Sequence, residues 1–165
     1  MNNSLLIGRR NSGKSTTIYA SLKKAQLLCG GVISLPVFRC GYKIGADALD
    51  VSTGEKQVLT RLSALCSPSQ FHRRRYLFNP AGINLGRSAI KRAIGKCDLV
   101  IVDEIGPLEL RGHKGWLNEA EDALRAGNSF IVIRESLRKE FFQRYGTNFD
   151  IVKKNSLPEI FELKR

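Results

Sequence analysis

The sequence predicts an α/β fold in which helices cover both faces of a mostly parallel, twisted sheet, with an antiparallel hairpin at one edge. Short apolar runs at 4–8, 99–102 and 130–133 alternate with segments of helical periodicity. This alternation is typical of parallel strands joined by helices. The run 99–102 is continuously apolar, which suits a central strand covered on both faces. Residues 32–38 and 42–49 are rich in β-branched and aromatic residues around a glycine-containing turn, which predicts the hairpin.

Apolar periodicity and turn residues assign the remaining elements in chain order. In the first half we expect a strand at 4–8, then a helix at 14–28 with Ile18, Leu22, Ala25 and Leu28 on one face and Gly30 and Gly31 ending it, the hairpin strands 32–38 and 42–49 around Arg39-Cys40-Gly41, a strand at 57–62, a polar loop at 66–75 and a short strand at 76–78. In the second half we expect a helix at 84–96, a strand at 99–102, a helix at 115–126 closed by Gly127 and a strand at 130–133. A helix at 136–145 between Ser136 and Gly146, a strand at 149–152 and a brief helix after Pro158 complete the chain.

Length and composition indicate one globular domain over residues 1–165, since 42% of the residues are hydrophobic and 25% are charged. No apolar run approaches the length of a membrane span, and no signal peptide is visible, so we expect a cytoplasmic protein without a membrane partner. Neither a zinc site nor a redox pair is expected from the spacing of the four cysteines and two histidines, which are Cys29, Cys40, Cys66, Cys97, His72 and His113. Cys97 is expected in the core.

The positive charge of the chain is uneven. The net charge is +12, and residues 1–82 carry 12 Lys/Arg against 3 Asp/Glu. A basic half attracts polyanions, of which nucleotide phosphates are one kind. The cluster His72–Arg75 is a solvated loop or a contact for nucleic acid, and no aromatic-interleaved RNA-binding signature accompanies it.

The segment Gly8–Ser15 fits the pattern GxxxxGK[ST] between an apolar run and a helical segment, the context of a phosphate-binding loop. Loop N–H groups and the helix N-terminus would face the phosphates. Lys14 would reach the β- and γ-phosphates, and the Ser15 hydroxyl would ligate Mg²⁺. Asn11 stands where many such loops have glycine, and asparagine tolerates the left-handed conformation. The sequence therefore predicts a P-loop NTPase fold that binds a nucleoside triphosphate through Gly8, Arg9, Arg10, Asn11, Ser12, Gly13, Lys14, Ser15 and Thr16.

A second motif, Asp103-Glu104, directly follows the apolar run 99–102, as a Walker B motif requires. Asp103 would hold Mg²⁺ beside Ser15, because ligands of open α/β sheets bind at the carboxyl ends of the strands. Glu104 would orient or deprotonate the attacking water, although it could instead be a helix cap or a surface charge. The transition state gathers negative charge on the γ-oxygens, so a further arginine would speed the reaction. The sequence does not choose among Arg73, Arg74, Arg75, Arg87 and Arg111.

The stretch Val102–Leu110, VDEIGPLEL, resembles the VDEIGxxEL segment of the cancer-related nucleoside-triphosphatase (THEP-type) family of P-loop NTPases. Weaker resemblances are the P-loop, the hairpin region 31–47 and the stretch 152–155. The family implies slow, Mg²⁺-dependent hydrolysis of nucleoside triphosphates to diphosphate and phosphate with broad base tolerance. It also implies that Lys14, Ser15, Asp103 and Glu104 keep the roles above. The chain departs from the family at Arg10-Asn11-Ser12, where Pro-Gly-hydrophobic is more typical.

Glu109 matches an acidic position of this family. The resemblance makes it a second-choice catalytic base or an orienting group. The alternative is a carboxylate at a helix N-terminus that the helix dipole stabilises.

Two other functions remain open at this point. One is a nucleotide-dependent switch whose basic half binds RNA or another polyanion. The other is a small P-loop kinase with the loop 66–75 as its lid. A dedicated GTPase is disfavoured, because Lys153-Lys154-Asn155-Ser156 does not supply an NKxD motif, although Asn155 could contact a base edge. The sequence does not give the oligomeric state.

Overall fold

The structure is a computed structural model that describes residues 3–63, 76–112 and 115–162. The predicted loop 66–75 lies outside these residues, and with it Cys66, His72 and three of the candidate arginines, Arg73–Arg75. His113 lies outside them as well. In the described part of the chain, no helix combines the length and apolar character needed to cross a membrane.

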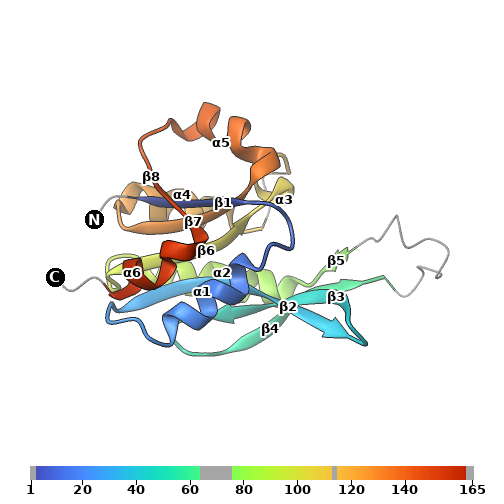
Figure 1. Ribbon diagram of the computed structural model, residues 1–165. Helices are drawn as coiled ribbons and strands as arrows, with labels where there is room; N and C mark the ends of the chain where they lie inside the picture. The colour runs from blue at the N-terminus through green and yellow to red at the C-terminus, as the bar shows by residue number, and fades with distance from the viewer. Residues whose placement is uncertain (1–2, 64–75, 113–114, 163–165) are drawn as a thin grey trace.

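The described strands form an eight-stranded sheet in the order β5-β4-β3-β2-β6-β7-β1-β8 (Figure 1). Its strands are β1 (Ser4–Gly8), β2 (Cys29–Arg39), β3 (Tyr42–Asp50), β4 (Lys56–Leu62), β5 (Tyr76–Phe78), β6 (Leu99–Ile105), β7 (Ser129–Arg134) and β8 (Asp150–Val152). The run from β2 through β6, β7 and β1 to β8 is parallel. Strands β3, β4 and β5 add antiparallel pairs at one side. The predicted fold class is confirmed.

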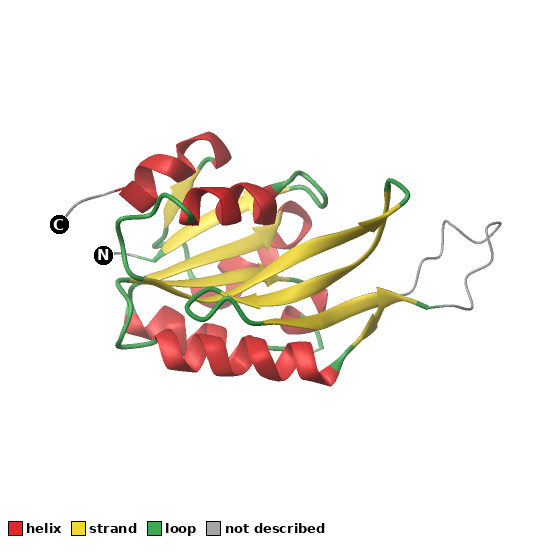
Figure 2. Ribbon diagram, turned by 90° about the horizontal axis from the view of Figure 1, so that it is seen from below, coloured by secondary structure: helices red, strands yellow, loops and turns green. Residues whose placement is uncertain are grey.

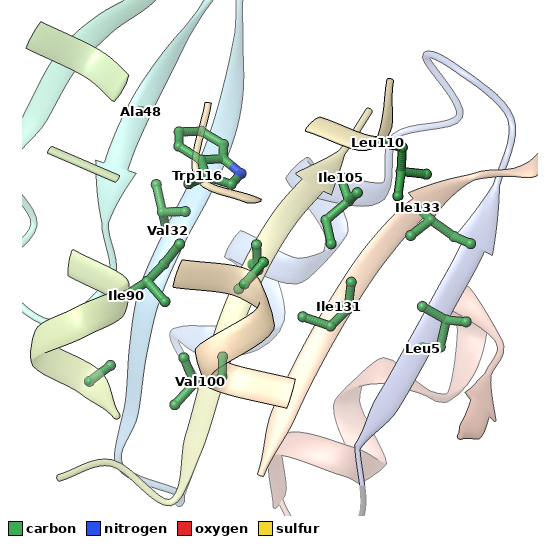
Figure 3. Packing of buried hydrophobic residues seen from close by; sticks show 14 of the residues in the cluster. Leu5, Val32, Ala48, Ile90, Val100, Ile105, Leu110, Trp116, Ile131 and Ile133 are labelled. Atoms are coloured by element: carbon green, nitrogen blue, oxygen red, sulfur yellow. The ribbon is translucent and has the colours of Figure 1, made fainter. Parts of the chain in front are cut away.

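Helices cover both faces of this sheet (Figure 2). They are α1 (Lys14–Leu22), α2 (Pro80–Ala93), α3 (Pro107–Leu110), α4 (Leu117–Ala126), α5 (Arg138–Tyr145) and α6 (Leu157–Glu162), with short 3₁₀ turns η2 (Glu135–Leu137) and η3 (Lys154–Ser156). Alternate strand residues face opposite sides. Leu5, Val32, Ile90 of α2 and Trp116 belong to one buried cluster, in which Val32 lies near Ile90 and Trp116 and Leu5 lies near Ile131 and Ile133 (Figure 3). Leu6 and Ile33 pack with Ile18 of α1 on the other face, where Leu157 and Phe161 of α6 complete the core.

The first helix is shorter than the pattern predicts. Helix α1 ends at Leu22, and Leu28, expected on its buried face, is 61% exposed. Gly30 and Gly31 do not end a helix, because they lie inside β2 and pair with Val100 and Ile101 of β6. A Cβ at Gly31 would overlap the Ile101 carbonyl oxygen. The glycines therefore serve close strand packing, which the periodicity of residues 14–28 does not reveal.

Other element boundaries differ by a few residues. Helix α2 begins at Pro80, where Asn79 accepts a hydrogen bond from the Ala81 N–H at 2.9 Å. Ser136 is not an N-cap, because it lies within the turn η2 and α5 begins after Leu137. The predicted ends at Gly127 and Gly146 are confirmed. Cys97, which was expected in the core, is partly buried and packs against the core cluster.

The length of β2 brings the hairpin to the edge where the parallel strands end. Only Cys29–Val32 pairs with β6, and the rest of β2 pairs with β3. The hairpin therefore extends beyond the carboxyl end of β6 (Figure 2). Its two-residue turn at Cys40 and Gly41 has φ of 49° and 76°, which agrees with the predicted glycine turn.

Gly31→Ala should lower the free energy of unfolding by about 2–4 kcal/mol, because the new methyl group would overlap the β6 backbone and φ is positive. Gly41→Ala is the matched control, since its φ is also positive but nothing lies within 4 Å of the added carbon. That control should lose only about 1 kcal/mol. Urea unfolding measures both, and equal losses would contradict the packing argument.

Candidate active site

The segment Gly8–Ser15 runs from the last residue of β1 through a loop into the first turn of α1, as the sequence predicts. Asn11 has φ of 58° and Gly13 has φ of 79°, so both adopt the left-handed conformation. A Cβ at Gly8 would lie 3.1 Å from Cδ of Lys14, which explains the first glycine of the pattern. Helix α1 has no side-chain N-cap and no acidic residue in its first turn. Among the described residues, its first N–H groups therefore remain available to an anion.

Lys14 is buried within this loop, with 6% of its surface exposed. Its ammonium donates to the carbonyl oxygens of Gly8 at 3.1 Å and Arg9 at 2.8 Å. These contacts hold a positive charge inside the curve of the loop, where a phosphate group would neutralise it.

Asp103 lies at the end of the buried strand β6, fully enclosed. Its Oδ2 accepts from the Ser34 N–H at 3.2 Å. Its Oδ1 is buried with no hydrogen-bond partner among the described residues. Burial raises the pKa of Asp103 to about 7, while the nearby Ser15 hydroxyl and the Ser34 N–H act in the opposite direction. The structure thus brings together the two predicted metal ligands, Ser15 and Asp103.

Glu104 is half-buried and is held by an arginine that the sequence analysis missed. The Nε–H of Arg134 donates to Glu104 Oε1, and the two side chains form an ion pair. The β6–β7 register shifts between Asp103 and Ile105, so Glu104 has no β7 residue directly opposite. Arg134 is the last residue of β7, the strand between β6 and β1. The rule that ligands bind at strand ends could have pointed to it.

Glu109 is buried in the short helix α3, with 6% of its surface exposed. Its Oε2 accepts from the Gly106 N–H at 2.9 Å, so the carboxylate caps its own helix. Burial raises the pKa of Glu109 to about 7, and Glu104 also raises it, whereas the N–H donors and Arg134 lower it. This is the capping role named above as the alternative to catalysis. The catalytic role of Glu109 stays a prediction.

Two lysines from distant segments also reach the loop. Lys154, just after β8, donates to the Ser12 carbonyl oxygen at 3.0 Å. Lys43, on the hairpin strand β3, lies 3.3 Å from Asn11 Oδ1 and donates to it. Lys154 follows the end of β8, so the rule that ligands bind at strand ends could have pointed to it as well. No local pattern marks Lys43, because its position depends on how far the hairpin extends.

The two candidate arginines within the described residues bind elsewhere. Arg87 donates to the Gly115 carbonyl oxygen at 2.6 Å and lies 3.8 Å from a carboxylate oxygen of Glu119. Arg111 forms an ion pair with Glu140 at 3.1 Å. Neither has a described contact with the loop 8–15.

The fold and this arrangement of loop, lysine and strand-end carboxylate define a P-loop nucleoside triphosphatase. The sequence matches the model of the family described as NTPase over residues 3–158. The chain therefore belongs to the NTPase family, an enzyme family of hydrolases that act on nucleoside triphosphates, which confirms the resemblance seen in VDEIGPLEL.

Curated relatives carry the name nucleoside-triphosphatase THEP1. The protein from Methanosarcina acetivorans is 26% identical over 92% of this chain and 90% of its own length. The one from Archaeoglobus fulgidus is 31% identical over 87% of this chain and 84% of its own length. The one from Ignicoccus hospitalis is 32% identical over 84% of this chain and 79% of its own length.

Two solved structures share the fold. The solution structure of a human cancer-related nucleoside triphosphatase superposes with a TM-score of 0.64 and 22% identity, covering 97% of this chain and 95% of that one. The crystal structure of THEP1 from Aquifex aeolicus gives a TM-score of 0.67 and 17% identity over 96% of each chain.

Glu109→Gln should change how stability depends on pH. The folded-state pKa of about 7 lies above the ordinary 4.5, so folding favours the protonated carboxyl, and stability is lost as pH rises from about 4.5 through 7. Glutamine keeps the acceptor for Gly106 and cannot ionise. Relative to wild type, the variant should gain about 2 kcal/mol between pH 5 and pH 8.

Urea unfolding of the nucleotide-free protein at the two pH values measures this gain. Glu159→Gln, at an exposed position of α6, is the control and should show none. An equal pH response in both variants would refute a titrating Glu109.

Proposed function

We propose that this protein hydrolyses nucleoside 5'-triphosphates to diphosphate and phosphate in an Mg²⁺-dependent reaction with slow turnover and broad base tolerance. The observation that carries the proposal is the convergence of Lys14, Ser15 and Asp103 at one edge of the sheet, with Glu104 beside them. The family and the names of its relatives support hydrolysis. The Mg²⁺ dependence, the slow rate and the broad base range are our inference.

The residues present suit Mg²⁺. The described residues hold no group of three or more His, Cys, Asp or Glu side chains that could bind a metal alone. Mg²⁺ in phosphoryl-transfer sites needs only one or two protein ligands besides phosphate oxygens and waters. Ser15 Oγ and the unpartnered Asp103 Oδ1 would be those ligands. When bound with the nucleotide, the metal neutralises charge on the β- and γ-phosphates.

The protein groups divide the remaining work. The loop N–H groups and Lys14 bind and orient the phosphates. Glu104 is the proposed base that orients water and takes its proton, and Arg134 holds that carboxylate in place. Glu104 is preferred to Glu109 because Glu109 already accepts the Gly106 N–H.

Broad base tolerance rests on the segment that follows β8. The NKxD motif that reads guanine ends in an acidic side chain. Here Lys153–Ser156 contains no acidic residue, and Lys154 binds the Ser12 carbonyl oxygen instead.

The experiment that tests the function is phosphate release from ATP, GTP, CTP and UTP with and without Mg²⁺. Slow release from all four only with Mg²⁺ is expected, whereas tight binding without release would favour a switch or a kinase.

Lys14→Ala should abolish nucleotide binding or reduce hydrolysis below detection, because it removes the buried charge that contacts the β- and γ-phosphates. Isothermal titration with ADP and Mg²⁺ measures the affinity. Lys24→Ala, an exposed lysine just after the same helix, is the matched control and should bind normally. Normal binding by both variants would rule out this loop as the phosphate site.

Glu104→Gln should reduce kcat by about 100-fold or more while nucleotide affinity stays near the wild-type value, since the amide cannot accept the proton from water. Steady-state phosphate release and ADP titration provide the two readouts. A variant that hydrolyses at the wild-type rate would transfer the base role to Glu109 or to the substrate itself.

A further inference from the structure

The γ-phosphoryl transition state needs positive charge beyond Lys14, and the arginines expected from the sequence do not supply it within the described residues. Arg87 and Arg111 are bound to other groups. Besides Lys14, the described residues include three cationic side chains from outside the loop that contact the loop or Glu104, namely Lys43, Arg134 and Lys154, and the loop itself contributes Arg9 and Arg10. Their contacts distinguish them.

Four of these five side chains are bound to other groups or are exposed, and Arg9 is exposed. Arg134 is paired with Glu104. Lys154 comes from the β8 side of the sheet and binds Ser12, so it approaches the loop from the side opposite the Walker B strand. Arg10 is exposed, and its guanidinium lies 5.7 Å from the centre of the Tyr76 ring.

Lys43 reaches the loop from the other direction. It is the second residue of β3, directly opposite Phe38 of β2, on the hairpin that extends past β6. Its backbone carbonyl oxygen accepts from the Tyr76 hydroxyl at 3.4 Å, which connects the start of β3 to β5. Its ammonium donates to Asn11 Oδ1 at 3.3 Å, a neutral acceptor on the loop itself.

The charges around Lys43 locate its ammonium between the loop and the Walker B carboxylates. Burial and Arg10 lower the pKa of Lys43, Arg134 also lowers it, and Glu104 and Asp103 raise it. The γ-phosphate of a nucleotide held by a P-loop lies between those same groups. An arriving phosphate anion would relieve the repulsion among the three cations.

We propose that Lys43 is a catalytic residue whose ammonium moves from Asn11 to the γ-phosphoryl oxygens and stabilises their charge in the transition state. This inference rests on the proposed function. In that step the water oxygen bonds to the γ-phosphorus, and the bond from that phosphorus to the β–γ bridging oxygen breaks. The proton of the water passes to Glu104, and the diphosphate leaves with the bonding electrons. Lys43 neither gains nor loses a proton.

Lys43→Met tests the role, because methionine keeps an unbranched stem and removes the charge. We expect kcat for phosphate release to fall about 100-fold or more, as for loss of one transition-state donor. The Kd for ADP with Mg²⁺ should stay within about threefold, while tight binding of the transition-state analogue ADP–aluminium fluoride should be lost. Lys43→Arg should restore part of kcat and part of the affinity for the transition-state analogue. Lys56→Met, an exposed lysine of β4, is the matched control and should behave as wild type.

The outcomes separate this inference from the function on which it rests. Wild-type protein that releases no phosphate overturns the proposed function and the role of Lys43 together. Wild-type release with Lys43→Met within about threefold of it overturns only the role of Lys43. A loss of ADP affinity as large as the loss in kcat would also overturn it, because Lys43 would then contribute uniform binding or loop structure. The urea unfolding midpoint of each variant shows whether the fold is retained.

Discussion

The close pairing of β2 with β6 is the constraint on which the rest of the molecule depends. It joins the parallel part of the sheet to the antiparallel strands through Cys29–Val32 and Leu99–Val102. The contact requires Gly31, because a Cβ there would overlap the β6 backbone. Since β2 continues beyond this pairing, the hairpin extends past the carboxyl end of β6, where the buried Asp103 lies. One strand pair thus places both the Walker B carboxylate and the hairpin lysine.

The electrostatics of the site follow from that burial. Asp103 is enclosed with one oxygen lacking a partner among the described residues, and such a carboxylate is costly unless a cation joins it. Three cations lie nearby. Lys14 and Lys43 donate to neutral oxygen atoms, and Arg134 pairs with the single carboxylate of Glu104. The metal–nucleotide complex that we propose would bring both a cation for Asp103 and anions for these side chains. It would therefore stabilise the charges of the site.

The loop adopts left-handed backbone at Asn11, one of the positions where the chain departs from the family pattern. Asn11 takes the left-handed conformation that glycine usually supplies, with φ of 58°. Its side chain, unlike that of glycine, also binds the hairpin through Lys43. The exposed Arg10 beside it lies against Tyr76. In this chain the substituted positions connect the loop to the antiparallel strands.

The sequence by itself determined the alternation of strands and helices, the phosphate loop and the Asp103-Glu104 pair, because each depends on residues close together in the chain. It misassigned Gly30 and Gly31 as a helix end, since strand packing overrode the local pattern. It also misassigned Ser136 as a cap, because a 3₁₀ turn that contains Ser136 precedes α5. Only the tertiary structure decided that Arg134 binds Glu104, that Lys154 and Lys43 reach the loop, and that Arg87 and Arg111 do not. These contacts join residues far apart in the chain, and sheet order and hairpin length, rather than neighbouring residues, set their distances.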